Sequence, residues 1–181
     1  MDTYPIRQFG DPVLKQRARE VTELDGALAR LVDTMFETMY EAAGVGLAAP
    51  QVGMQKRLFT YDVGEGPQVM VNPVVAETAG EWSHEEGCLS VPGLSFEVVR
   101  AERVVVHGVD LDGNEVIVED DDFLGRVFLH EIDHLDGILV LDRLDADQRK
   151  LALRELRDRE LVDAGRFDSP FPPASRSRPR L

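Results

Sequence analysis

Large apolar side chains recur at helical spacing in the first third of the chain. The stripe consists of Leu24, Leu28, Leu31, Val32, Met35 and Met39. It follows Thr22-Glu23-Leu24-Asp25, which resembles a capping box with Asp in the final position. The pattern predicts a helix that ends near Ala43-Gly44, because glycine commonly follows the last helical turn. We expect the stripe, with its two methionines, to belong to the hydrophobic core rather than to a cofactor site.

The middle of the chain has the short-period pattern of β-structure. Runs rich in valine and aromatic residues span residues 56–63, 69–76, 96–109 and 115–119. The turn Asp112-Gly113-Asn114 separates the last two runs. This close spacing favours antiparallel hairpins over strand–helix–strand units. Helical periodicity returns at residues 123–137, and a charged helix with a thin apolar stripe is expected at residues 145–164.

Size and composition indicate one globular domain. The 181 residues are 43% hydrophobic and 30% charged. No apolar run approaches the ~20 residues that a membrane span needs, and the N-terminus lacks the basic and apolar segments of a secretory signal. We therefore expect a cytoplasmic protein without membrane contact. Because residues 169–181 are rich in proline, serine and arginine, we expect a domain over residues 1–168 and a flexible tail.

The formal net charge of −14 argues against direct nucleic-acid binding by the folded body. The acidic run Glu119-Asp120-Asp121-Asp122 is expected to lead into a helix, where carboxylates complement the positive helix N-terminus. Its spacing is not that of an EF-hand calcium loop.

The segment His130-Glu131-Ile132-Asp133-His134 has the pattern H-E-x-x-H. On a helix, two histidines four residues apart lie on one face and can bind one metal ion. Glu131 projects from the neighbouring face, where it would reach a metal-bound water rather than the metal. The alternative is a pair of surface histidines on an amphipathic helix.

A catalytic metal ion generally has a third protein ligand. The metzincin pattern would put a histidine at position 140, but Val140 cannot bind a metal. A zinc peptidase of the other H-E-x-x-H kind would use a glutamate from a later helix, and Glu155 and Glu160 are candidates. The remaining candidate is Cys88, the single cysteine, whose other possible role is that of a small buried residue.

Three segments together resemble the peptide deformylase family. They are Gly44-Val45-Gly46-Leu47-Ala48-Ala49-Pro50-Gln51, Glu86-Gly87-Cys88-Leu89-Ser90, and His130-Glu131-Ile132-Asp133-His134-Leu135-Asp136-Gly137. They occur in the order of the family, and the resemblance extends from near residue 1 to about Leu144. It implies an α+β fold in which antiparallel β-sheets pack around a central H-E-x-x-H helix, with an N-terminal helix and a C-terminal helix.

The resemblance also implies an activity, in which a metal-dependent hydrolase removes the formyl group from the N-terminal formyl-methionine of nascent polypeptides and releases formate. Cys88, His130 and His134 would bind the metal, with water in the fourth position. Glu131 would accept the proton of that water and later donate it to the leaving amine. The Gln51 side-chain amide would stabilise the oxyanion together with the backbone N–H of the residue after Cys88, which is Leu89.

The substrate-binding residues that the resemblance implies are Gly44, Val45, Gly46, Glu86, Phe123 and Val127. Gly46 would let an extended substrate backbone approach a sheet edge closely. Phe123 and Val127 share a helix face with the two histidines, so they are expected to wall a methionine pocket or to pack in the core.

The cofactor implied by the resemblance is one divalent metal ion, with Fe²⁺ expected. Two imidazoles and a thiolate also suit Zn²⁺, Ni²⁺ or Co²⁺. The expected partners are formyl-methionyl nascent peptides and the ribosome near its exit tunnel. Positive charge for ribosome contact would come from Arg166, Arg176, Arg178 and Arg180. A non-catalytic metal-binding module is the alternative function.

Four further residues lie within the family motifs in the sequence or between them. Asp133 and Arg100 are candidates to orient the metal ligands, and the alternative for Asp133 is a surface salt bridge. Arg126 stands where some family members have an apolar pocket residue, so it is expected to point outward or to meet the substrate backbone. Ser95 stands where some members have an arginine, which puts the family's substrate contact at that position in doubt.

Overall fold

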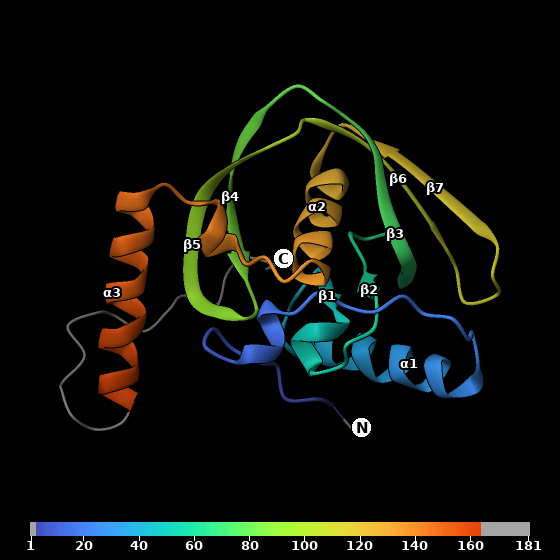
Figure 1. The fold of residues 1–181 in the computed structure, drawn as a ribbon, viewed down its shortest axis with the longest axis horizontal. Coiled ribbons are helices and arrows are strands. Elements are labelled where there is room, and N and C mark those ends of the chain that lie inside the picture. The colour runs from blue at the N-terminus through green and yellow to red at the C-terminus, as the bar shows by residue number, and fades with distance from the viewer. Residues whose placement is uncertain (1–2, 164–181) are drawn as a thin grey trace.

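The helix α2 (Phe123–Leu135) runs between two antiparallel β-sheets (Figure 1). The computed structural model describes the backbone of residues 3–163 and the side chains of residues 3–159. Of the 13 residues of α2, all but Phe123, Leu124 and Leu129 are buried. Burial on nearly every side makes α2 a core helix. The predicted α+β fold, with antiparallel sheets around a central helix, is confirmed.

The larger sheet has the strand order β1-β2-β3-β6-β7, and the smaller sheet consists of β4 and β5. The strands are β1 (Gly46–Ala48), β2 (Leu58–Tyr61), β3 (Gln68–Ala79), β4 (Trp82–Cys88), β5 (Val91–Arg100), β6 (Arg103–Val109) and β7 (Glu115–Asp120). Every pairing within these sheets is antiparallel, as the hairpin spacing predicts. The short strand β1 forms one edge of the larger sheet.

Two further helices flank this arrangement. The helix α1 (Gly26–Glu41) packs on β1 and β2, and α3 (Ala146–Asp163) lies on the outer side of β5 (Figure 1). The connections include the short 3-10 helices η1 (Pro12–Lys15), η2 (Ala49–Val52) and η3 (Val140–Arg143). Within residues 3–163, the structure contains no helix with both the length and the apolar character required to span a bilayer.

Three hydrophobic clusters make up the core of the described residues. Toward the larger sheet, Phe128 packs in one cluster with Phe59 and Val104. A second cluster joins α1 to β1 and β2. A third lies under β5 and includes Val98 and Leu141. Because burial removes apolar surface from water, the first cluster holds the H-E-x-x-H helix against the larger sheet.

The start of α1 differs from the sequence prediction. Asp25, rather than Thr22, caps the helix, because its carboxylate accepts a hydrogen bond from the Leu28 N–H at 2.8 Å. Leu24 therefore precedes the helix and is 40% exposed. The other five residues of the predicted stripe are buried in the core.

The strand predictions contain one error and one omission. The sequence predicts a single strand over residues 96–109, and this is wrong because β5 and β6 belong to different sheets. The chain crosses between the sheets at Ala101 and Glu102. The sequence reading also misses β4, whose polar composition, Trp82-Ser83-His84-Glu85-Glu86, conceals the alternation of a strand.

Candidate metal centre

The metal centre forms where β4 faces α2. Alternation along β4 puts Glu86 and Cys88 on one face, and helical periodicity puts His130 and His134 one turn apart on α2. The Cys88 Sγ lies 3.2 Å from the His134 Nε2. One potential ligand atom from each of Cys88, His130 and His134 lies within 4.8 Å of the others.

Each of the three side chains suits a divalent metal ion. Burial raises the pKa of the Cys88 thiol to about 12, and a nearby cation is what would favour the thiolate there. Burial, together with the charge of His130, lowers the pKa of His134 and so favours the neutral imidazole that binds metals. Among the described residues, His130 Nε2 is buried without a hydrogen-bond partner. A metal ion would satisfy that atom, so the donor set fits the expected cofactor.

Glu86 contacts His130 at Nδ1, the ring nitrogen that is not available to the metal. Its Oε2 lies 3.1 Å from His130 Nδ1, and Arg100 donates to both carboxylate oxygens, at 2.6 and 3.0 Å. Burial would raise the pKa of Glu86, but the hydrogen bonds from His130 and Arg100 outweigh it and hold the pKa well below its ordinary value. The ionised carboxylate accepts from Nδ1–H, which leaves the Nε2 lone pair of His130 for a metal.

Glu131 is fully buried beside these ligands. Burial raises its pKa well above the ordinary value, although the positive charge of Arg100 opposes the rise. Neither carboxylate oxygen has a hydrogen-bond partner among the described residues. A Cβ added at Gly46 would lie 2.9 Å from the Glu131 Cδ, so the absence of a side chain at Gly46 makes room for this carboxylate. A carboxyl group with a raised pKa suits proton transfer near neutral pH.

Gln51 and Leu89 flank the cysteine. The Gln51 Oε1 accepts a hydrogen bond from the Ala48 N–H at 2.8 Å. This bond turns the amide nitrogen toward Ser90 Oγ at 3.2 Å and Cys88 Sγ at 4.0 Å. Leu89 lies in the turn between β4 and β5 and is buried. Both residues predicted to stabilise an oxyanion therefore adjoin Cys88.

The residues predicted to bind substrate lie around this centre. Gly44 and Val45 join α1 to β1, and Val45 packs at the edge of the α2 core cluster. Val127 is fully buried in that cluster and Phe123 is partly buried against it. Packing in the core is thus confirmed for Val127, and its contact with methionine stays a prediction.

Several neighbours of the site differ from their predicted places. The prediction that Arg126 points outward is wrong, because Arg126 is 1% exposed and donates to Glu86, and its contact with the substrate backbone stays a prediction. Its guanidinium also lies over the Trp82 ring, with Cζ 4.8 Å from the ring centroid. Sequence reasoning misses this contact together with the strand β4 that carries Trp82. Ser95 donates to Glu85 at 2.5 Å.

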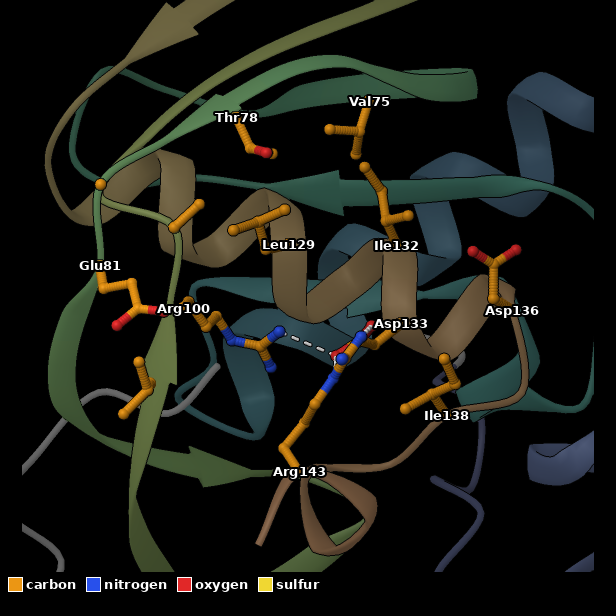
Figure 2. Close-up of a pocket in the computed structure, with 13 residues that line it drawn as sticks. Val75, Thr78, Glu81, Arg100, Leu129, Ile132, Asp133, Asp136, Ile138 and Arg143 are labelled. Carbon is orange, nitrogen blue, oxygen red and sulfur yellow. Dashed lines mark hydrogen bonds and ion pairs between the residues drawn. The ribbon is translucent and has the colours of Figure 1, made fainter.

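Asp133 and Arg100 form a network that extends from the site to a cavity. Arg100 donates to Asp133 at 2.8 Å, and Arg143 donates to the same carboxylate. In Figure 2, both guanidinium groups point toward Asp133. The cavity has a volume of about 480 Å³, and α2 lines it with Leu129, Ile132 and Asp133 rather than with its histidines. It therefore lies on a different face of α2 from the metal centre.

The alternative third ligands receive no support from the described residues. Val140, which replaces the third histidine of the metzincin pattern, is buried in the core under β5. Glu155, on α3, is paired with Arg159 at 2.6 Å and does not belong to the cysteine–histidine cluster. The side chain of Glu160 lies outside the described residues.

Comparison with known proteins identifies the family. The model of the polypeptide deformylase family matches residues 3–150. The chain belongs to this family. Peptide deformylase from Acidothermus cellulolyticus is 49% identical to it over 160 residues, which are 88% of this chain and 89% of that protein. Members of the polypeptide deformylase family are metallohydrolases that deformylate nascent peptides, so the predicted enzyme class is confirmed.

Solved structures of polypeptide deformylases share the fold. The crystal structure of a peptide deformylase from Legionella pneumophila has a TM-score of 0.85 and 39% identity, over 90% of this chain and 98% of that one. A peptide deformylase from Ehrlichia chaffeensis in complex with actinonin has a TM-score of 0.84 and 36% identity, over 88% and 99% of the two chains.

Proposed function

We propose that this chain removes the formyl group from the N-terminal formyl-methionine of nascent polypeptides, with Cys88, His130 and His134 as the ligands of one divalent metal ion. The observation that carries the proposal is the buried cluster of these three ligands beside Glu131. Three protein ligands leave one position of a tetrahedral site open, as hydrolysis requires. The bound metal ion supplies an acidic water and a Lewis acid for the formyl oxygen.

Glu131 is the proposed general base and acid. Its buried carboxylate has no competing hydrogen bond within the described residues, so it is free to accept a proton from water. It then donates that proton to the amine nitrogen as the formyl carbon–nitrogen bond breaks. A positioned carboxyl group of this kind typically contributes about 10²–10⁴-fold in rate.

Gln51 and Leu89 are the proposed oxyanion donors. The Gln51 Nε2–H and the Leu89 backbone N–H would donate to the oxygen that becomes negative as the formyl carbon turns tetrahedral. The hydrogen bond between Gln51 Oε1 and Ala48 N–H supports this role, because it fixes the orientation of the amide before substrate binds. The loss of one such donor typically lowers turnover by about 10²–10³-fold.

The edge strand β1 is the proposed place for the substrate backbone. An extended peptide beside Gly44, Val45 and Gly46 would add a strand to the larger sheet. Phe123 and Val127, on the ligand-bearing face of α2, would then contact the methionine side chain. Substrate contact by Glu86 is retained as a prediction.

The deciding experiment measures formate release and metal content together. Purified, metal-loaded protein should release formate from a formyl-Met peptide. Glu131→Gln should keep its metal and lose most activity, whereas Cys88→Ser should lose both. A loaded wild type that releases no formate contradicts the proposal. Metal retention by Cys88→Ser, with cleavage of internal peptide bonds, would favour the zinc peptidase alternative. Undiminished function of Glu131→Gln would favour a non-catalytic metal-binding module.

Fe²⁺ is the proposed native metal. The thiolate and two imidazoles accept Fe²⁺, Zn²⁺, Ni²⁺ and Co²⁺ alike, so the ligands alone do not select among them. Purification without oxygen, followed by elemental analysis, should give iron near one equivalent. Recovery of another metal under these conditions contradicts this assignment.

We also propose cytoplasmic action on chains emerging from the ribosome, by a domain over residues 1–168. The tail at residues 169–181, which lies outside the described residues, would contribute positive charge to ribosome contact. Deletion from Ser169 onward should weaken co-sedimentation with ribosomes while formate release persists. Unchanged co-sedimentation would remove the tail from the proposal.

A further inference from the structure

Glu86 receives more donors than its contact with His130 requires. Its Oε1 accepts from Arg100 Nε and from Arg126 Nη1, and its Oε2 accepts from Arg100 Nη2 and lies against His130 Nδ1. All four residues are buried. Arg100 is shared, since its Nη1 donates to Asp133 at 2.8 Å. Arg126 makes no ion pair with any other described residue, so Glu86 is its sole acidic partner.

Arg126 is anchored on the side away from His130. Its Nη1 also donates to the Val98 carbonyl at 3.2 Å, its Nη2 donates to the Trp82 carbonyl, and its Cζ lies 4.8 Å from the Trp82 ring centroid. The planar guanidinium fork can serve these acceptors together, whereas an ammonium group is a point charge. Arg126 thus links the first residue of β4 and the end of β5 to Glu86.

We propose that Arg126 is a positioning residue for the metal centre, acting through Glu86 on His130. The inference rests on the proposed assignment of His130 as a metal ligand. With Arg126 on Oε1, the Glu86 carboxylate is held by donors on two sides, and its Oε2 faces the His130 Nδ1–H. Without Arg126, only Arg100 would fix the carboxylate, and Arg100 is also drawn toward Asp133 at the cavity wall (Figure 2).

The consequence concerns the direction of the His130 ring. A histidine ligand is oriented by the acceptor of its other N–H, and loss of such partners typically costs about 10–100-fold in metal affinity or activity. Arg126 lies one link further out than Glu86, so we expect an effect at the lower end of that range. The ring should sample a wider range of directions, and the metal should leave faster.

The test uses Co²⁺ as the bound metal, because its visible bands and its thiolate charge-transfer band report ligand geometry without any assay of activity. Arg126→Met removes the guanidinium and keeps an unbranched side chain. The matched control is Arg57→Met, since Arg57 is also buried but donates to the Pro73 carbonyl and to Asp136, not to Glu86. Both variants should lose stability.

Arg126→Met should release Co²⁺ to a chelator about tenfold faster than wild type, with shifted visible bands. Arg57→Met should keep the wild-type release rate and spectrum. If Arg126→Met also keeps both, Arg126 has only a structural role and the inference is overturned. If it does not fold, Arg126→Lys carries the same test, because one ammonium cannot replace the fork, and wild-type behaviour of that variant overturns the inference equally.

The readout separates this inference from the proposed function. Wild type that binds Co²⁺ with a thiolate band but releases no formate contradicts the function alone, and the release rates still decide the role of Arg126. Wild type that binds no Co²⁺ contradicts both.

Discussion

The carboxylate of Glu131 lies in the space that a side chain at position 46 would need. A Cβ on Gly46 would meet the Cγ of Glu131 at 3.1 Å and its Cδ at 2.9 Å. The sequence motif predicts that Gly46 admits the substrate backbone. The structure adds a second reason for glycine, which is that it admits the proposed catalytic base.

Gly46→Ala should therefore lower turnover by much more than its loss of stability can explain. The added methyl group displaces the Glu131 carboxylate, and misplacement of a catalytic group by about 1 Å can cost about 10²-fold in rate. The measurement is kcat for formate release at full metal occupancy, beside the urea midpoint.

Gly26→Ala is the matched control for this change. Its Cβ would meet only the end of the Arg30 side chain, at 3.4 Å, in the first turn of α1. Turnover should be unchanged, and stability should be equal or slightly higher. Similar kcat values for the two variants would contradict the role assigned to Gly46.

Single residues also show which contacts the motifs predict and which they do not. The cluster of Cys88, His130 and His134 follows from the motifs, because family pattern specifies ligand types and order. The Arg126–Glu86 contact does not follow, since it joins residues 40 positions apart on elements that meet only in the folded chain. Pattern reasoning detects neighbours along one helix or strand and does not register such pairs.

At the scale of elements, helices are predicted better than strands. The predicted helix at residues 123–137 matches α2 (Phe123–Leu135), and the one at 145–164 matches α3 (Ala146–Asp163). Both have local caps and periodicity that act within the segment. The sequence prediction merges β5 and β6 into one strand, because the boundary between them depends on which sheet each strand joins. That choice is made by tertiary packing, in which β6 lies against α2 and β5 against η3.

The end of α2 depends on Gly137. This residue has φ +74°, and a Cβ on it would lie 2.8 Å from the backbone carbonyl of Lys15. Gly137→Ala should destabilise the protein by more than about 1 kcal/mol, because left-handed strain is added to a clash with backbone that cannot rotate away. Urea unfolding measures the difference.

Gly113→Ala measures the left-handed backbone strain without the clash against a neighbouring backbone. Gly113 has φ +82°, but its Cβ would meet only the flexible Leu24 side chain, at 3.4 Å. Its loss should be limited to the backbone strain of about 1 kcal/mol. Equal losses at the two positions would mean that the contact with Lys15 contributes nothing to stability.

At the scale of the whole molecule, the proposed metal ion connects the smaller sheet to α2. A ligand that binds only the folded state stabilises it, by about 2.7 kcal/mol at a free concentration 100 times its Kd. Chelation should therefore lower the unfolding temperature of the wild type. Cys88→Ser should show a much smaller change on chelation, and equal changes in the two proteins would contradict the assignment of Cys88.

Acid should weaken the contacts of Asp142, which joins η1, α3 and the segment that precedes η3. This carboxylate pairs with Lys15 and accepts from Leu139 N–H at 2.9 Å and Arg149 at 2.8 Å. Partial burial raises its pKa, but these donors outweigh burial and the pKa is lowered. The stability from Asp142 is therefore present above an unfolded pKa of about 3.9, and it is lost as pH falls through the lower folded pKa.

Asp142→Asn should lower stability at pH 7 by about 1 kcal/mol or more, through the lost charged hydrogen bonds. It should also flatten the fall of stability below about pH 5, since the titrating group is gone. Urea midpoints measured from pH 7 to pH 3 give both quantities. Asp121→Asn, at an exposed position, is the control. A wild-type slope in Asp142→Asn would exclude Asp142 as a source of acid sensitivity.

Cys88 Sγ and His134 Nε2 lie 3.2 Å apart, although the two residues are 46 positions apart in the sequence. Closing so long a loop costs chain entropy that local structure does not recover. The β4–β5 hairpin must reach α2 before these two atoms can meet. We therefore expect the metal centre to form late in folding, after the β4–β5 hairpin has brought Cys88 to the two histidines of α2.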